Sequence, residues 1–513
     1  DVRSGLQKLL KDGLLLFNYT GHGGTTALSD EKVLTQTDIN QFTYTHLPVW
    51  VTATCDFTRF DDLNTSAGED VFLNKSSGGI ALFTTVRVAY SRPNFPINDN
   101  VIRNLFERNN GRRRTLGEVM QATKNTLSSV YKLGFCLIGD PAVKMAYPEF
   151  GMKVTTVNGQ SVDGNSISFK ALEKITVEGE VLDASGQLVT DFTGIVNPTV
   201  KDSKVTVTCL KNSNKDDSPA FTFTDYPNTI FIGNDSVRNG KFSFTFTVPK
   251  DISYSNLQGK MNLYAVDTES GNEAQGNFDN FIVGGTSDTA ETDTIGPEIR
   301  ALYLNDTTFV DGGQVNTTPY FVAELWDKSG VNITGSSVGH DMMLVIDEST
   351  VLSYNLNSYY ELLLGEDGTG IVKFPIPALE PGKHTAEFWV WDILNNSTVR
   401  TFTFEVVEGL KPFLFDVIAT PGIAREQVTF HLMHNRPESR MRVGIMVYDL
   451  AGRQLWKHEE SGTSGLFENY TVSWDLTSGG ARMRPGVYIY RAAISTDNSK
   501  DATKARKFII LGE

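Results

Sequence analysis

The pattern of apolar residues changes near residue 150, and this change limits the possible folds more than any other feature of the sequence. Before it, three apolar runs are nearly continuous, at residues 14–19, 48–54 and 79–86. Runs of this kind are typical of parallel strands that are covered on both faces. A fourth run at 134–138 ends in a Gly-Asp-Pro turn at residues 139–141. We therefore predict a mostly parallel sheet within residues 1–148.

Helical periodicity lies between the last two of these strands. Apolar residues recur on one face over residues 97–106 and again over 116–130. Thr115 and Glu118 have the spacing of a capping box, which marks the start of the second helix. The chain opens with a short helix-like segment and then enters an apolar strand at once. We expect it to be the C-terminal part of a longer precursor, with the N-terminal half of this α/β domain missing.

After residue 150 the apolar residues alternate with polar ones, as in strands with one buried face. Phe242, Phe244 and Phe246 follow this rule directly after Asn239-Gly240, a pair typical of tight hairpins. Residues 284–297 are poor in apolar side chains and are typical of a linker. The regular spacing of strands and turns favours immunoglobulin-like β-sandwiches. We predict three such modules, at residues 150–285, 295–408 and 411–513.

The charge of the chain is unevenly distributed and narrows the choice of partners. The net charge is −15, and residues 151–410 alone carry −19. An acidic surface repels nucleic acid and anionic lipid, so we expect no nucleic-acid partner. These carboxylates can also bind Ca²⁺ between strand loops, although no EF-hand pattern is present. We expect no cofactor to be required, and a structural calcium ion remains an open alternative.

The residues that carry chemistry follow the first two apolar strands. The first strand leads into Gly21-His22-Gly23-Gly24, and the second leads into Cys55. In an open parallel sheet, functional groups gather at the carboxyl ends of the strands. A thiolate is a nucleophile, and a neighbouring imidazole can take its proton and later protonate a leaving amine. The sequence therefore predicts a catalytic pair of His22 and Cys55.

Two backbone groups beside this pair are candidates for binding a tetrahedral oxyanion. Glycine has no Cβ, so the chain around His22 can turn sharply and lie against a substrate carbonyl. The N–H groups of Gly23 and Cys55 can then donate to the oxyanion. No second Cys or His has the spacing of a metal ligand near either residue, so we predict no metal at this site.

Other chemically active residues have simpler interpretations. Five carboxylates follow Cys55 closely: Asp56, Asp61, Asp62, Glu69 and Asp70. One of them can orient His22, but the simpler interpretation is that they are charges on a solvated loop. The other charged and thiol residues are expected to lie in loops, in strands or in the core. They are His46, the arginines at 112–114, Cys136, Cys209, His431 and His434.

The motifs around the catalytic pair resemble those of a known peptidase family. The Gly-His-Gly-Gly sequence after one apolar strand and a Cys after the next are similar to the caspase-like clan. Residues 53–56, the strand from Gly78 and the turn at 139–141 resemble the gingipain family within that clan. The last module resembles the sorting domain of type IX secretion cargo, on its turn at 449–453 and its strand at 485–491.

Over its whole length the chain resembles the sortases of the type IX secretion system. This resemblance implies a cysteine endopeptidase and transpeptidase on the outer membrane, facing the cell exterior. It implies that the enzyme removes the C-terminal sorting domain from exported cargo through a thioester on Cys55. The cargo would then pass to an amine of a surface lipopolysaccharide. It also implies an outer-membrane β-barrel partner, PorV, which would hold the enzyme without a spanning helix.

Two other functions remain open at this point. One is a secreted degradative protease of the gingipain type, which carries the last module as its own sorting signal. The other is a surface adhesin or scaffold, in which the peptidase domain is inert and the β-sandwiches bind. The dyad itself does not decide whether water or an amine resolves the thioester, so the transpeptidase assignment follows from the resemblance alone.

Overall fold

The computed structural model describes residues 2–512 except 90, 110, 212–218, 289–292, 336–338, 364–367 and 497–498, and it leaves out the side chains of residues 4 and 91–93. The chain forms two compact units. Unit 1 contains residues 1–151 and 182–187, and unit 2 contains residues 152–181 and 188–513. Each unit is described by itself. None of the described helices is long and apolar enough to cross a membrane.

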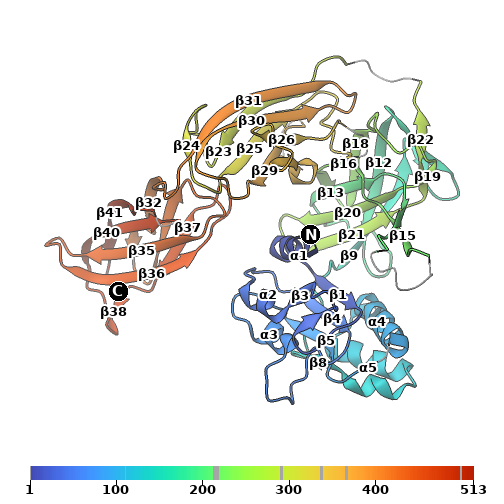
Figure 1. The fold of residues 1–513 in the computed structure, drawn as a ribbon, viewed down its shortest axis with the longest axis horizontal. Helices are drawn as coiled ribbons and strands as arrows, with labels where there is room; N and C mark the ends of the chain where they lie inside the picture. The colour runs from blue at the N-terminus through green and yellow to red at the C-terminus, as the bar shows by residue number, and fades with distance from the viewer. Residues whose placement is uncertain are drawn as a thin grey trace. The chain divides into compact units, whose positions relative to one another are not determined.

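Unit 1 is built on a four-stranded sheet with the order β1-β4-β5-β8 (Figure 1). The strands β1 (Leu16–Thr20), β4 (Val49–Ala53) and β5 (Ala81–Thr85) run parallel, as the apolar runs predicted. The fourth strand, β8 (Phe135–Ile138), is antiparallel to β5. The sheet is therefore mostly parallel.

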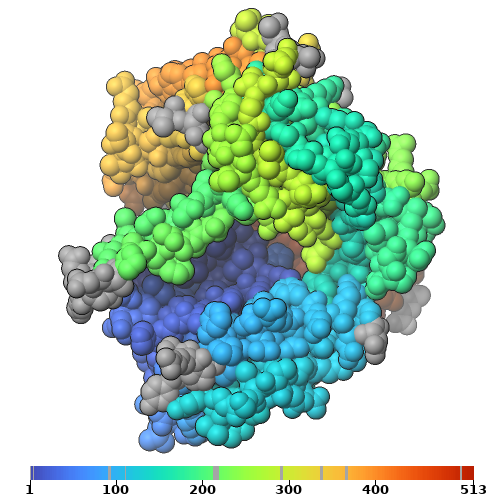
Figure 2. Space-filling view, turned by 90° about the vertical axis from the view of Figure 1, so that its right-hand side faces the viewer, coloured from blue at the N-terminus to red at the C-terminus, as the bar shows by residue number. Residues whose placement is uncertain are grey.

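Both faces of this sheet are covered, which explains why its strands are apolar throughout. Val49 and Val51 of β4 pack on one face, in a cluster with residues of the helices α4 (Ser91–Phe106) and α5 (Leu116–Thr126). Trp50 points to the other face. It belongs to a cluster with residues of α1 (Val2–Asp12), α2 (Gln36–Gln41) and α3 (Ala67–Leu73). The helices α4 and α5, light blue and cyan, form part of the surface of unit 1 in Figure 2.

Local signals in the sequence of unit 1 are partly confirmed. Thr115 and Glu118 form the predicted capping box at the start of α5. The short helices α2 and α3 were not predicted, because 6 and 7 residues are too few to establish a clear helical periodicity. The remaining elements are short: β2 (Ala27–Leu28), β3 (Leu34–Thr35), β6 (Arg108–Asn109), β7 (Arg112–Arg113) and the 3₁₀ turn η1 (Val130–Gly134).

Unit 2 consists of β-sheets, and its first part contains a nine-stranded sheet and a three-stranded sheet. The predicted Asn239-Gly240 hairpin is present, because Arg238 pairs with Lys241 and both turn residues have positive φ, at 51° and 72°. The strands are β9 (Phe150–Val157), β10 (Gln160–Ser161), β11 (Ile167–Ala171), β12 (Lys174–Leu182), β13 (Gly194–Lys201), β14 (Val205–Thr208), β15 (Thr222–Asp225), β16 (Thr229–Ile232), β17 (Asp235–Arg238), β18 (Lys241–Thr247), β19 (Leu257–Gln258), β20 (Lys260–Asp267), β21 (Glu273–Phe278) and β22 (Phe281–Thr286).

The next part of unit 2 contains a four-stranded and a five-stranded sheet, whose facing apolar residues form one core. The first sheet has the order β23-β25-β29-β28 and the second the order β24-β31-β30-β26-β27. The elements are β23 (Glu298–Leu304), β24 (Gln314–Val315), β25 (Tyr320–Trp326), β26 (Met343–Ile346), β27 (Ser353–Asn355), the turn η2 (Asn357–Tyr359), β28 (Tyr360–Leu362), β29 (Gly370–Pro375), β30 (Gly382–Trp391) and β31 (Ser397–Val406).

The last part repeats this two-sheet design, with a three-stranded and a five-stranded sheet around a separate core. The predicted turn at Asp449 closes a hairpin between β35 and β36. The strands are β32 (Leu414–Thr420), β33 (Ile423–Ala424), β34 (Val428–His434), β35 (Met441–Tyr448), β36 (Gln454–Gly462), β37 (Tyr470–Trp474), β38 (Thr477–Ser478), β39 (Ala481–Arg482), β40 (Gly486–Ser495) and β41 (Ala502–Ile510). The protein is thus mostly β-sheet and contains several domains, while the predicted boundaries near residues 148, 285, 295, 408 and 411 stay predictions.

Candidate active site

The predicted pair lies at the carboxyl ends of two neighbouring strands of unit 1. β1 and β4 are adjacent and parallel, and their last paired residues are Thr20 and Ala53. His22 is the second residue after β1, and Cys55 is the second residue after β4. Neighbouring strands lie ~4.8 Å apart. The register therefore delivers both side chains to the same edge of the sheet, at the same distance along it.

The backbone of His22 is held firmly while its side chain is exposed. The hydroxyl of Tyr19 donates to the backbone oxygen of His22 at 2.6 Å, and the N–H of Ser29 donates to the same oxygen at 2.8 Å. A Cβ on Gly21 would lie 2.7 Å from that hydroxyl, so the Tyr19 contact requires glycine at this position. Burial of Tyr19 raises the pKa of its phenol, which keeps it a hydrogen-bond donor. Sequence reasoning missed Tyr19, because a tyrosine in a strand usually only packs.

Gly23 lies closely over the residue that precedes Cys55. A Cβ on Gly23 would lie 2.3 Å from Oγ1 of Thr54, which is itself fully buried. Gly23 also forms an isolated antiparallel bridge with Leu28. On either side of it, the N–H of Ser29 donates to the His22 oxygen and the N–H of Gly24 donates to the Ala27 oxygen.

Two backbone donors at this edge are unused. Within the described part of the chain, the N–H groups of Gly23 and Cys55 donate to no other group. Both are thus available for an acceptor from outside the protein.

The thiol of Cys55 is half-buried and sits at a sharp bend in the chain. Its Sγ donates to the backbone oxygen of Ala89 at 3.1 Å. The next residue, Asp56, has φ of 49°, in the left-handed region that non-glycine residues rarely adopt. Among the described residues no hydrogen bond joins Cys55 to His22. Hydrogen bonds of this kind are often loose or absent before substrate binds.

The loop after Cys55 is tied to the end of β5. Arg87 makes a bidentate ion pair with Asp61, in which its two terminal nitrogens lie 2.6 and 3.0 Å from the carboxylate oxygens. This contact lowers the pKa of the Asp61 carboxyl below its usual value. Beneath the loop, a buried chain of hydroxyls runs from Thr52 through Thr84 to Thr58, with both distances at 2.8 Å. These hydroxyls therefore tie Thr58, in the loop that follows the thiol, to β4 and β5.

Four of the five carboxylates that follow Cys55 are engaged elsewhere. Asp61 pairs with Arg87, Asp62 with Arg59, and Glu69 caps α3 through Ser66. Asp70 accepts hydrogen bonds from Gln36 and Asn40. No contact links the described carboxylates to His22, and a third member of the site stays untested.

The remaining sequence candidates lie away from the thiol. The arginines at 112–114 were expected in a solvated loop, but two of them form β7, and the three pair with Glu118, Glu149 and Glu107. Cys136 lies on β8, half-buried. Cys209 was expected within a strand, but it follows β14 and is exposed. His46 lies in an exposed loop. His434 on β34 is half-buried, and this burial lowers its pKa to about 4.

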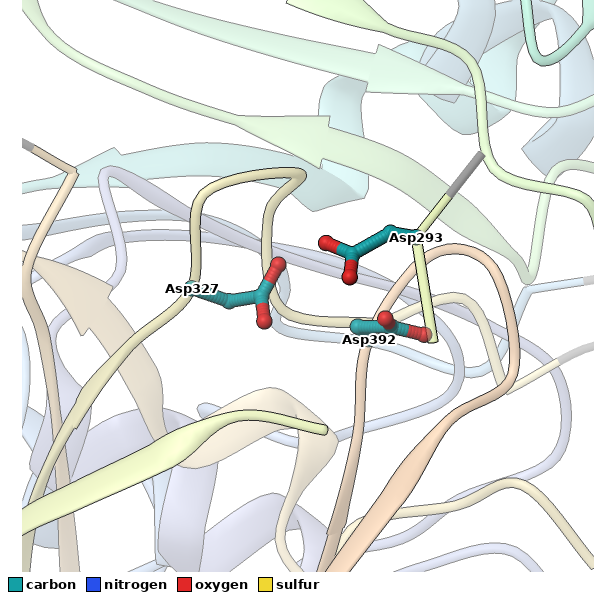
Figure 3. Close-up of side chains that lie close together, drawn as sticks. All are labelled: Asp293, Asp327 and Asp392. Atoms are coloured by element: carbon teal, nitrogen blue, oxygen red, sulfur yellow. The ribbon is translucent and has the colours of Figure 1, made fainter. Parts of the chain in front are cut away.

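One group of acidic residues in unit 2 has the chemistry of a cation site (Figure 3). Asp293, Asp327 and Asp392 each bring a carboxylate oxygen within 4.8 Å of the other two. Asp327 and Asp392 follow two similar strand ends, Leu325-Trp326 and Val390-Trp391. Burial raises the pKa of Asp327 to about 6, and the neighbouring carboxylates add to this shift. Oxygen ligands of this kind suit Ca²⁺, so the structural calcium ion that the sequence left as an alternative has a candidate place and stays untested.

Comparison with known proteins identifies the class of the N-terminal unit. Residues 1–146 match the model of Peptidase family C25. Residues 1–146 therefore belong to a cysteine peptidase domain of the gingipain family. The resemblance to this family that the sequence motifs indicated is confirmed. Among curated proteins, no sequence matches the chain.

Among solved structures, the chain is similar to latent dimeric PorU from Porphyromonas gingivalis. The two are 34% identical, the match covers 100% of this chain and 47% of PorU, and the TM-score is 0.35. The chain thus spans about half the length of that relative. It is also similar to the Arg-specific cysteine proteinase gingipain R, at 19% identity over 55% of this chain and 56% of the other, with a TM-score of 0.27. A complex of Porphyromonas gingivalis RgpB pro- and mature domains matches at 20% identity over 55% and 57%, with a TM-score of 0.26.

Proposed function

We propose that the chain belongs to a sortase-type cysteine endopeptidase, in which Cys55 is the nucleophile and His22 is the proton carrier. The observation that carries this proposal is the parallel register of β1 and β4, in which Thr20 pairs with Ala53. Family C25, whose model matches residues 1–146, supplies the reaction class. The match to PorU over the whole of this chain supports a sortase over other cysteine peptidases, while the sorting-type motifs of the last module fit a sortase and a gingipain-type protease alike.

In the proposed reaction, the Sγ of Cys55 attacks the carbonyl carbon of the scissile peptide bond of a cargo protein. His22 takes the thiol proton, and the resulting oxyanion is bound by the N–H groups of Gly23 and Cys55. When the intermediate collapses, the C–N bond breaks and His22 protonates the departing amine of the sorting domain. The cargo then remains as a thioester on Cys55.

The second half of the reaction transfers the cargo to an amine. His22 removes a proton from the incoming amine, whose nitrogen attacks the thioester carbon. The C–S bond then breaks, and the Cys55 thiolate returns. We place this acceptor on a surface lipopolysaccharide and the enzyme on the outer membrane, held by a PorV-type partner. We assign unit 1 a caspase-like fold and the modules after it immunoglobulin-like folds, as the sequence resemblance implies.

The test is the state of cargo C-termini in cells that carry Cys55→Ala. We expect cargo to keep its sorting domain in the variant, and wild-type cargo to end in an amide-linked adduct that mass spectrometry identifies. The matched control is Cys209→Ala, which removes an exposed thiol outside unit 1.

Each rival function gives a different result in this experiment. Free cargo carboxylates in the wild type would point to hydrolysis by a degradative protease of the gingipain type. Normal processing in Cys55→Ala would remove the enzymatic proposal and leave the adhesin.

A further inference from the structure

Helix α4 carries two buried asparagines whose side chains reach the strand ends of the active site. Asn94 and Asn98 are 4% and 8% exposed and lie one helical turn apart. On the same face, the later residues Val101 and Leu105 are apolar and pack in the core. Along this row of residues, α4 is therefore polar where it passes the carboxyl ends of β1 and β4 and apolar further on.

Each asparagine contacts one of the two segments that lead into the site. Nδ2 of Asn94 donates to the backbone oxygen of Thr54 at 3.2 Å, and Thr54 immediately precedes Cys55. Nδ2 of Asn98 makes a short hydrogen bond to Oγ1 of Thr20, two residues before His22. One helix thus anchors both strand ends.

Stability alone does not account for these side chains. The Oδ1 atoms of Asn94 and Asn98 are buried and have no hydrogen-bond partner among the described residues. Burying an amide oxygen in this way costs about 1–3 kcal/mol, and an apolar residue of similar size would avoid the cost. The useful part of Asn94 is therefore its N–H donor, which contacts the Thr54 carbonyl.

The Thr54 carbonyl belongs to the same peptide unit as the N–H of Cys55. A trans peptide is planar, and its C=O and N–H point in opposite directions. A donor that fixes the carbonyl therefore also fixes the direction of the N–H on the other side of the unit. It also polarises the peptide, which makes that N–H a stronger donor.

We infer that Asn94 is a positioning residue for the oxyanion-binding N–H of Cys55. It acts through the Thr54–Cys55 peptide and touches no reacting atom. Thr54 is confined on its other side by Gly23, whose own N–H is the second candidate donor. The inference rests on the proposed role of Cys55 and adds to it a residue from α4 that prepares the site for negative charge.

The test compares two reactions of Cys55 that differ in whether an oxyanion forms. Iodoacetamide alkylates the thiolate by direct displacement and needs no oxyanion donor. p-Nitrophenyl acetate acylates it through a tetrahedral oxyanion: the S–C bond forms, the C–O bond breaks and p-nitrophenolate leaves. Both adducts on Cys55 are measured by mass spectrometry in the full-length protein, with Cys209→Ser to remove the exposed thiol.

We expect Asn94→Ala to slow acylation of Cys55 at least tenfold, because loss of a whole oxyanion donor costs about 10²–10³ in rate. Alkylation by iodoacetamide should keep its wild-type rate. Asn94→Leu removes the donor with little change in the size of the side chain, and it gives the same test if the alanine variant does not fold. The matched control is Asn104→Ala, a residue of α4 with 8% exposure that bonds to Thr123, outside the site.

The possible failures are distinguishable. If acylation and alkylation fall together in both Asn94 variants, or if neither changes, the positioning role is wrong although the proposed function stands. If wild-type Cys55 is not acylated at all, the proposed nucleophile is wrong, and the role of Asn94 is overturned with it.

Discussion

Substitution of Gly23 by alanine tests the geometry of the site most directly. The added Cβ would lie 2.3 Å from Oγ1 of Thr54 and 3.3 Å from the backbone oxygen of Ala27. Carbon atoms pack at ~3.5 Å or more, so Gly23 or Thr54 must move by about 1 Å. Thr54 is fully buried and its carbonyl is held by Asn94, so the segment of His22 is the part that moves.

The size of the effect follows from this displacement. A misplacement of ~1 Å in an active site can cost about 10²-fold in rate. Overpacking a tight contact costs about 1–3 kcal/mol of stability. We therefore expect Gly23→Ala to fold, with modestly lower stability, and to lose about 10²-fold in the rate of cargo cleavage.

The assay measures cleavage of a purified cargo protein and thermal unfolding of the same samples. Gly24→Ala is the matched control, because a Cβ on Gly24 would meet nothing within 4 Å. The double variant Gly23→Ala, Thr54→Ala removes the clashing hydroxyl and should recover part of the lost rate. Equal activity of Gly23→Ala and Gly24→Ala would refute the claim that Gly23 lies against Thr54 at the site.

Three further predictions concern charge and burial. Burial raises the pKa of Asp327 to about 6 from 3.8, so its contribution to stability is largest below pH ~4 and is lost as pH rises through 6. A shift of one pKa unit corresponds to ~1.4 kcal/mol. In urea titrations, Asp327→Asn should therefore raise the free energy of unfolding at pH 7 by no more than about 3 kcal/mol and leave it unchanged near pH 4. A loss of stability at pH 7 would mean that a cation holds the carboxylate. Arg87→Ala breaks an exposed, solvent-screened ion pair with Asp61, so the midpoint of thermal unfolding should hardly change, and any change should shrink in high salt; a large, salt-independent loss of stability would contradict this. Arg436 is 1% exposed and donates to the carbonyls of residues 410 and 411. Arg436→Leu leaves these carbonyls without their donor, so it should destabilise the last module by about 2–4 kcal/mol in thermal melts. Unchanged stability would contradict the claim that these buried hydrogen bonds matter.

Much of the architecture could be predicted because it depends on local patterns of apolar and polar residues along the chain. The continuous apolar runs located β1, β4, β5 and β8 to within two residues. The Asn239-Gly240 turn and the Thr115 capping box needed only neighbouring residues. The parallel strands lie in the sheet in the order in which they follow along the chain, so consecutive strand ends already placed His22 and Cys55 at a shared edge.

The features that could not be predicted from the sequence depend on contacts between distant segments of the chain. The arginines at 112–114 looked like a solvated loop because their partners lie as far away as Glu149. The carboxylates of Asp293, Asp327 and Asp392 come together from three separate segments. Nothing near Cys55 in the sequence indicates that Asn94 contacts Thr54, because 40 residues separate them.

The sequence by itself determined which strands lead into an imidazole and a thiol, since a strand's pattern and its last residues are local properties. The tertiary structure decided what surrounds those groups: the Tyr19 hydroxyl on the His22 backbone, Gly23 against Thr54, and α4 across both strand ends. The physical reason is that a hydrogen bond or a steric contact depends on distances of a few ångströms. Only the packed chain fixes such distances between residues far apart in sequence.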